Sequence, residues 1–109
     1  MAVRNGARFL PQAVDSMLAQ TFSDFEFLVA DDASTDATPE LLDKYCAKDA
    51  RVRVLRQEES DYIPALNRMC TEARGKYIAR MDADDIATPE RLALQVENIR
   101  PRPRLAALG

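Results

Sequence analysis

Residues 25–41 read FEFLVADDASTDATPEL, and this segment contains the strongest indication of the fold. Its first part, 25–30, is a compact run rich in strand formers, which is typical of a strand buried in a parallel sheet. Asp31 and Asp32 end the run, and a polar loop follows. Residues 38–40, Thr-Pro-Glu, predict a helix start, because they combine a capping residue, a proline at the first helical position and an acid. The stretch therefore predicts a strand, a loop and a helix in succession.

The same alternation extends through the rest of the chain. Paired apolar residues at helical spacing and helix-end signals predict further helices over about 7–20, 63–73 and 89–100. Short apolar runs predict strands or strand remnants at 1–4, 52–55, 77–81 and 105–108. Alternating helices and strands indicate an α/β protein, with a mostly parallel sheet between helices in a three-layer α/β/α arrangement. Because both ends look like cuts through a strand, we expect residues 1–109 to be one partial domain, truncated at both ends.

The composition argues against several classes of protein. A net charge of −3 disfavours a nucleic-acid partner, which needs a basic surface. There is no histidine and no CxxC pair, so neither a zinc site nor a Ser-His or Cys-His nucleophile is available. No apolar stretch approaches the roughly 20 residues of a membrane-spanning helix. We expect a cytoplasmic protein without a membrane segment in this chain, and segments outside it leave attachment to the inner face of a membrane open.

A second acidic cluster follows the predicted strand at 77–81. Residues 81–91 read MDADDIATPER, and the ATPE before the next helix repeats the ATPE at 37–40. Both acid clusters are therefore expected at the carboxyl edge of the sheet, where open α/β folds bind ligands. Two like charges about 4 Å apart repel by roughly 4 kcal/mol at an effective dielectric near 20, so converging carboxylates favour a bound cation or a proton.

These motifs resemble a known family in their order and spacing. The chain is similar to the nucleotide-binding, Rossmann-like half of family 2 glycosyltransferases with the GT-A fold. The resemblance covers essentially the whole chain and rests on residues 3–6, 18–22, 24–26, 31–36, 73–78 and 81–85.

The resemblance implies a role for particular residues. The end of the first strand, at Ala2, Val3 and Arg4, corresponds to the part that lies against the nucleotide base. Asp32 matches the acid that accepts a hydrogen bond from the base. Asp82 matches the first acid of the DxD motif, near the ribose and the metal. Asp84 matches the direct ligand of Mg²⁺ or Mn²⁺, which bridges the diphosphate.

The resemblance also implies an activity. The intact protein is expected to be an inverting, metal-dependent glycosyltransferase of polysaccharide biosynthesis, which moves a sugar from a nucleoside-diphosphate donor, expected to be UDP-linked, to an acceptor hydroxyl. The acceptor, whether saccharide, lipid or protein, stays open. The catalytic base is expected downstream of this chain, so the chain alone is expected to be inactive. The family usually has an aromatic residue where Arg4 stands, which leaves the identity of the nucleotide base less certain. Arg80 is expected to pair with Asp31 or Asp85.

Two other functions fit the gross pattern. A response-regulator receiver domain has a similar length and also places acids after two strands, with Asp82 as the residue to phosphorylate. However, a receiver begins with its acid-pair strand, whereas a strand remnant and a helix come first here. A noncatalytic nucleotide-binding fragment is the other alternative. Helix capping alone accounts for either acid cluster separately, but less well for both.

Overall fold

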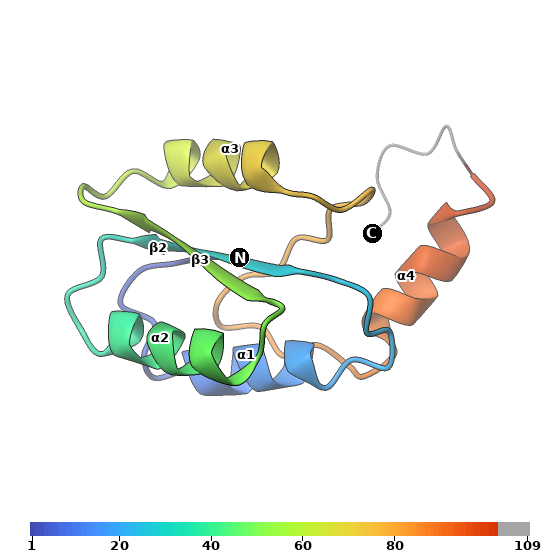
Figure 1. Ribbon diagram of the computed structural model, residues 1–109, viewed down its shortest axis with the longest axis horizontal. Coiled ribbons are helices and arrows are strands. Elements are labelled where there is room, and N and C mark those ends of the chain that lie inside the picture. Colours follow the sequence, from blue (N-terminus) through green and yellow to red (C-terminus); the bar gives the residue numbers. More distant parts are fainter. Residues whose placement is uncertain (103–109) are drawn as a thin grey trace.

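Three parallel strands form the centre of the fold in a computed structural model of the chain, which describes residues 1–102 (Figure 1). The strands are β1 (Ala2–Val3), β2 (Phe27–Asp32) and β3 (Val52–Gln57). The helices are α1 (Leu10–Leu18), α2 (Thr38–Lys48), α3 (Tyr62–Glu72) and α4 (Arg91–Ile99). The order in the sheet is β1-β2-β3, so β2, the strand that ends in two acids, lies in the middle.

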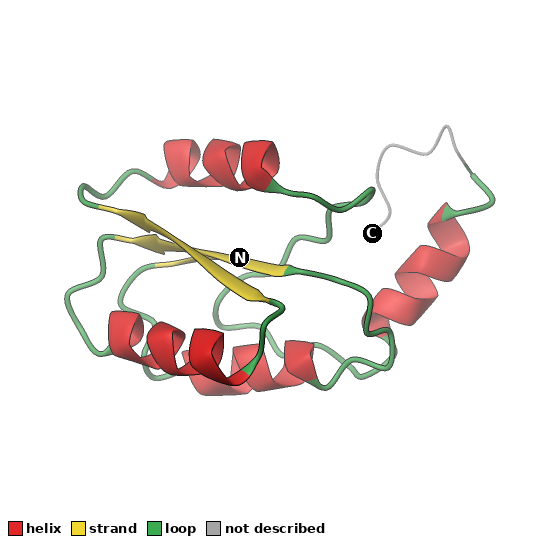
Figure 2. Ribbon diagram, in the orientation of Figure 1, coloured by secondary structure: helices red, strands yellow, loops and turns green. Residues whose placement is uncertain are grey.

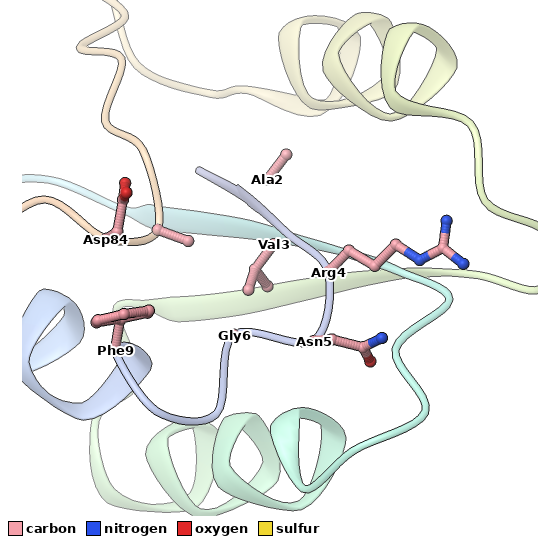
Figure 3. Close-up of a pocket in the computed structure, with 8 residues that line it drawn as sticks. Ala2, Val3, Arg4, Asn5, Gly6, Phe9 and Asp84 are labelled. Atoms are coloured by element: carbon pink, nitrogen blue, oxygen red, sulfur yellow. The ribbon is translucent and has the colours of Figure 1, made fainter.

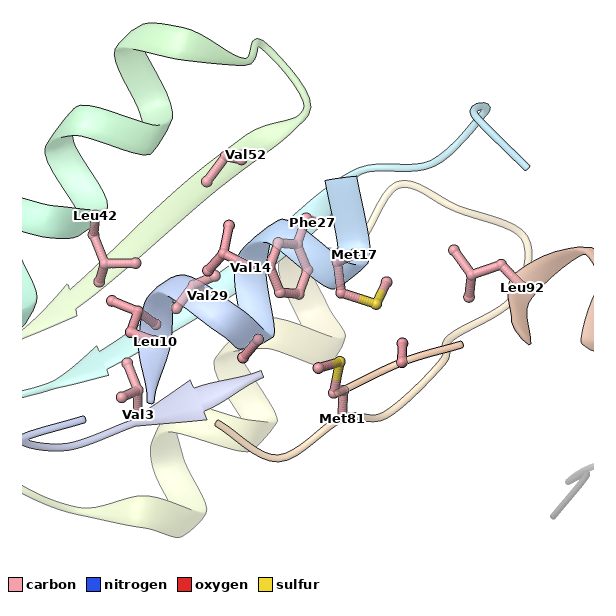
Figure 4. Close-up of a cluster of buried hydrophobic side chains, with 12 residues drawn as sticks. Val3, Leu10, Val14, Met17, Phe27, Val29, Leu42, Val52, Met81 and Leu92 are labelled. Atoms are coloured by element: carbon pink, nitrogen blue, oxygen red, sulfur yellow. The ribbon is translucent and has the colours of Figure 1, made fainter. Parts of the chain in front are cut away.

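Helices cover both faces of this sheet, as Figures 1 and 2 show: α3 lies on one face, and α1 and α2 lie on the other. Each face has its own apolar cluster. The larger cluster includes Val14, Val29 and Leu42, all fully buried (Figure 4). The smaller cluster, beneath α3, includes Ala30 and Met69. The predicted three-layer α/β/α arrangement is therefore confirmed.

The two clusters also show which way the acids at the end of β2 face. Side chains alternate between the two faces of a strand. Val29 packs with α1 and α2, whereas Ala30 packs beneath α3. Asp31 therefore belongs to the α1–α2 face and Asp32 to the α3 face. In the register of the sheet, Asp31 lies beside Val3 of β1 on one side, and Asp32 lies beside Gln57 of β3 on the other.

One predicted element does not form. Residues 77–81 form a loop and pair with no strand among residues 1–102, so the strand predicted at 77–81 is wrong for the described part of the chain. A strand needs a partner for its backbone groups, and β1, at the edge of the sheet, is only 2 residues long. Met81 is still buried in the larger cluster, while Ile78 is 63% exposed. The strand predicted at 105–108 lies outside the described residues.

The start of α2 differs from the prediction as well. Thr38 is the first helical residue and not the cap, and its hydroxyl accepts a hydrogen bond from the Gly6 N–H at 3.0 Å. The Asp36 carboxylate accepts the Thr38 N–H at 2.9 Å in its place. The start of the helix was therefore predicted at the right position. However, the Thr38 side chain connects α2 to the turn after β1 instead of capping its own helix.

Ala33, just after β2, gives a first prediction about stability. Its φ is 54°, in the left-handed region that costs a residue with a Cβ about 1–2 kcal/mol. We expect Ala33→Gly to raise the free energy of unfolding by about 1 kcal/mol. Urea unfolding measures this, with Ala47→Gly in α2 as the matched control. The control is expected to destabilise by up to about 1 kcal/mol, because glycine weakens a helix. Equal losses in both variants contradict the strain at Ala33.

Candidate functional site

The turn after β1 and the loop after β2 are joined by Asn5. Its N–H donates to the Ser34 hydroxyl at 2.9 Å, and its Oδ1 accepts the Thr35 and Asp36 N–H groups at 2.7 and 3.3 Å. Asn5 has a φ of 49°, a conformation that asparagine tolerates better than most residues. Gly6 follows, and a Cβ there would lie 2.5 Å from the Val3 side chain. These contacts fix the carboxyl ends of β1 and β2 against each other.

Asp32 is a buried carboxylate that accepts three hydrogen bonds from the last residue of β3 and the segment after it. Its Oδ1 accepts from Gln57 Nε2 and from the Asp61 N–H, both at 2.8 Å, and its Oδ2 accepts from the Ser60 hydroxyl at 2.9 Å. Burial by itself raises the pKa of Asp32, but these donors and the charge of Arg4 outweigh it and lower the pKa below its ordinary value. Asp32 is therefore an ionised acceptor, and Oδ2, with one protein donor, is the oxygen best able to take another.

Arg4 extends from the end of β1 toward this carboxylate. Its Nη1 donates to the Ser60 hydroxyl at 2.6 Å, and that hydroxyl in turn donates to Asp32. Arg4 and Asp32 are thus connected through a single side chain. A guanidinium and a carboxylate next to each other present a donor and an acceptor to the same ligand.

The acidic cluster lies in a turn and not at the end of a strand. The Asp85 N–H donates to the Asp82 carbonyl, and the Asp82 N–H donates to the Asp85 carboxylate, both at 3.2 Å. Asp85 therefore closes the turn, several residues before α4 begins. Arg80 pairs with Asp82 at 3.3 Å and with the Tyr62 hydroxyl at 3.1 Å, so the expected partners Asp31 and Asp85 were wrong. This ion pair is largely exposed, so it contributes little to stability.

An open pocket of about 270 Å³ lies between the end of β1 and this turn (Figure 3). Its lining consists of Ala2, Val3, Arg4, Asn5, Gly6, Phe9, Ala83 and Asp84. Figure 3 shows Asp84 and Phe9 on one side, with the Arg4 side chain extending away from them. The structure thus brings together four of the predicted site residues, Ala2, Val3, Arg4 and Asp84. Asp32 is connected to Arg4 through Ser60, and Asp82 begins the turn that contains Asp84, but neither Asp32 nor Asp82 lines the pocket.

The acidic turn, residues 82–85, has oxygen ligands that suit a hard divalent cation. Within residues 1–102 no three acidic, cysteine or histidine side chains lie close enough together to hold a metal by themselves. Mg²⁺, however, is usually held through one or two carboxylates, with substrate phosphates and water as the other ligands. The exposed carboxylates of Asp82 and Asp84 fit that donor set. The turn suits a cation that arrives with a phosphate-bearing ligand.

The donors around Asp32 were not found from the sequence. Gln57, Ser60 and Asp61 lie in a segment that the sequence marks only as a polar loop between a strand and a helix. The carboxyl ends of neighbouring parallel strands lie at the same edge of a sheet, so a polar segment after one strand lies near the end of the next. This was the one signal in the sequence for donors near Asp32. Which of its residues turn inward depends on the backbone path, which composition does not specify.

Comparisons with known proteins agree with one another. A family model described as Glycosyl transferase family 2 matches residues 1–109. EpsE of Bacillus subtilis, named as a glycosyltransferase, is 36% identical over 111 residues that cover 100% of this chain and 40% of EpsE. Chondroitin synthase of Escherichia coli is 33% identical over 104 residues, which cover 95% of this chain and 15% of the synthase.

A solved structure with the same architecture carries a nucleotide. The crystal structure of S. aureus TarS 1–349 in complex with UDP superposes with a TM-score of 0.83 and 26% identity, covering 94% of this chain and 31% of that one. This chain thus spans less than half the length of each of these relatives. Among residues 1–102, no helix is long and apolar enough to cross a membrane. The predicted cytoplasmic location stays a prediction, as does the extent of the domain.

Proposed function

Because this chain belongs to glycosyl transferase family 2, we propose that it forms the donor-binding part of an enzyme that transfers a sugar from a nucleoside-diphosphate sugar to an acceptor hydroxyl. The proposal rests on the pocket at the end of β1, which Arg4 and Asp84 both line. Arg4 is connected to Asp32 through the Ser60 hydroxyl. A receiver domain, the alternative weighed from the sequence, is not supported, since the family match extends over residues 1–109.

The base of the nucleotide is proposed to bind at the Arg4–Asp32 end. Asp32 is ionised and offers Oδ2 to an N–H group, and Arg4 offers donors to a carbonyl oxygen. Uracil presents an N–H group flanked by two carbonyl oxygens, which complements this pair. The UDP held by TarS supports the choice of uracil. We therefore propose a UDP-linked donor.

The diphosphate is proposed to lie at the acidic turn, with Mg²⁺ or Mn²⁺ held by Asp84 and Asp82. When bound, such a cation stabilises the negative charge that develops on the departing nucleoside diphosphate. Asp84 lines the pocket, so its carboxylate is the nearer of the two to a ligand there. Arg80 holds Asp82 in the structure and must release or share that carboxylate for both acids to act together. Metal dependence and inversion at the sugar carbon follow from the family resemblance and stay proposals. The same holds for a catalytic base, for the acceptor hydroxyl, outside residues 1–109.

Calorimetric titration of the chain with UDP, GDP and TDP, each with and without Mn²⁺, tests this function. UDP is expected to bind more tightly than GDP, and Mn²⁺ is expected to increase its affinity at least tenfold, about 1.4 kcal/mol. TDP presents the same imide edge as UDP, so its expected affinity lies closer to that of UDP than to that of GDP. Absence of nucleotide binding by the folded chain contradicts the proposal, and UDP binding that ignores Mn²⁺ contradicts the role of the acidic turn.

A further inference from the structure

Gln20 is a buried amide that lies just past the end of α1. Its side chain makes three hydrogen bonds and is part of a residue only 6% exposed. Nε2 donates to the Ser16 carbonyl at 3.2 Å and to the Thr88 carbonyl at 2.7 Å, and Oε1 accepts the Leu92 N–H at 3.0 Å. Both donors and the acceptor of the amide are thus used, and two of the three bonds reach a segment about 70 residues further along the chain. No other residue type of this size both donates and accepts in this way without a charge.

The amide provides what α4 lacks. The residue before the helix, Glu90, makes no side-chain capping bond. The Arg91 N–H donates to the Thr88 carbonyl at 3.1 Å, so the Leu92 N–H is the next group of α4 that needs a partner. Gln20 Oε1 supplies one, at Leu92, from outside the helix. The Thr21 N–H donates to the Pro89 carbonyl at 2.9 Å, and the Ala87 N–H donates to the Ser16 hydroxyl at 3.0 Å. The end of α1 therefore holds the whole segment 87–92.

In the sequence, the acidic turn lies between two buried residues. Met81, before the turn, is buried in the cluster that α1 helps to form (Figure 4), and Ala87, after the turn, is buried in the same cluster. Arg91, the first residue of α4, donates to the Arg80 carbonyl at 2.6 Å, so the start of the helix contacts both sides of the turn. Within the turn, Ala83 is half-buried against the larger apolar cluster, whereas Asp82, Asp84 and Asp85 are exposed. Beyond that contact, the position of the three acids depends on the buried residues Met81 and Ala87 on either side.

We propose that Gln20 is a positioning residue for the acidic turn: by fixing segment 87–92 on α1, it holds Asp82 and Asp84 where a metal and a diphosphate can meet them. The inference rests on the proposed function. It assigns Gln20 no contact with the ligand. The Arg4–Asp32 end of the site is held by separate contacts, from Asn5 and the segment after β3, so it is expected to be independent of Gln20.

Amide hydrogen exchange on the ligand-free chain tests the anchor. Gln20→Met keeps the length of the side chain and removes its three hydrogen bonds. We expect the Asp82 and Asp85 amides, which close the turn, to exchange about tenfold faster, while the amides of β2 and β3 are unchanged. Gln12→Met, at an exposed position of α1, is the matched control and is expected to change neither. Unchanged exchange at Asp82 and Asp85 in Gln20→Met overturns the inference. If Gln20→Met does not fold, Ser16→Ala, which removes the acceptor of the Ala87 N–H, is judged by the same amides.

Binding measurements separate positioning from a purely structural role. In Gln20→Met, the gain in UDP affinity on adding Mn²⁺ is expected to fall at least fivefold, while metal-free binding of uridine stays within twofold of wild type. A variant that loses thermal stability but keeps the full Mn²⁺ gain shows that Gln20 only supports the fold, and overturns the inference. Wild-type chain that binds UDP without any Mn²⁺ gain instead refutes the proposed metal-binding role of the acidic turn, and with it the functional half of this inference. The exchange experiment still decides whether Gln20 anchors the turn.

Discussion

Asp84→Asn is expected to remove most of the Mn²⁺-dependent affinity for UDP, a loss of at least about tenfold. Asparagine has nearly the same shape, but it replaces a charged oxygen ligand by a neutral amide, and hard divalent cations favour carboxylates. Metal-free binding of UDP is expected to be unchanged or slightly tighter, because the variant also removes a negative charge beside the diphosphate. Calorimetric titration with UDP, with and without Mn²⁺, measures both quantities.

The matched control for this variant is Asp24→Asn. Asp24 is an exposed acid in the loop before β2, so its replacement gives the same change in net charge away from the pocket. The control is expected to keep the full Mn²⁺ gain. If both variants lose the gain equally, the effect comes from net charge and Asp84 has no special role. If neither loses it, the metal is held elsewhere.

Asp32→Asn is expected to lower the free energy of unfolding by about 2 kcal/mol at neutral pH and to abolish selective binding of UDP. The amide has one oxygen where the carboxylate has two, so it cannot accept from Gln57, Ser60 and Asp61 together. One of these donors then faces an N–H group. Urea unfolding measures the first effect, and titration with UDP and GDP measures the second.

The pH dependence of this variant tests the cause. The folded-state pKa of Asp32 lies below its unfolded value, so the stabilisation is fully present above the unfolded pKa and is lost as the pH falls through the folded one. The difference in unfolding free energy between wild type and Asp32→Asn is therefore expected to be largest at neutral pH and to shrink below about pH 4. A difference that is the same at pH 7 and at about pH 3 means that the carboxylate charge is not the source of the stabilisation.

The elements that leave a continuous apolar or helical pattern in the sequence were predicted well. The run 25–30 and its two acids gave the central strand β2, since a buried strand leaves a continuous apolar signal. The helices were also found, although their ends moved: the first was expected over about 7–20 and spans Leu10–Leu18. Helix ends depend on loop contacts as well as on propensity, as Thr38 shows, and such contacts come from distant parts of the chain.

The predictions that failed depended on a partner that sequence alone does not supply. Residues 77–81 have the composition of a strand, but β1, at the edge of the sheet, is too short to offer them many backbone groups for pairing. Arg80 was expected beside Asp31 or Asp85 and pairs with Asp82, because the turn brings the nearer carboxylate within reach. The anchor at Gln20 joins residues about 70 positions apart, which no local pattern reports.

In the proposed complex, one nucleoside diphosphate extends from Asp32 to Asp84 with its cation at the acidic turn. Amide spectra of the chain with UDP test it most directly when recorded once with diamagnetic Mg²⁺ and once with paramagnetic Mn²⁺. We expect UDP with Mg²⁺ to shift the amide signals of Asp32 and Asp61, and Mn²⁺ to broaden those of Ala83 and Asp84 most strongly. Broadening centred on α2 or β3, with the signals of residues 82–85 left sharp, contradicts it.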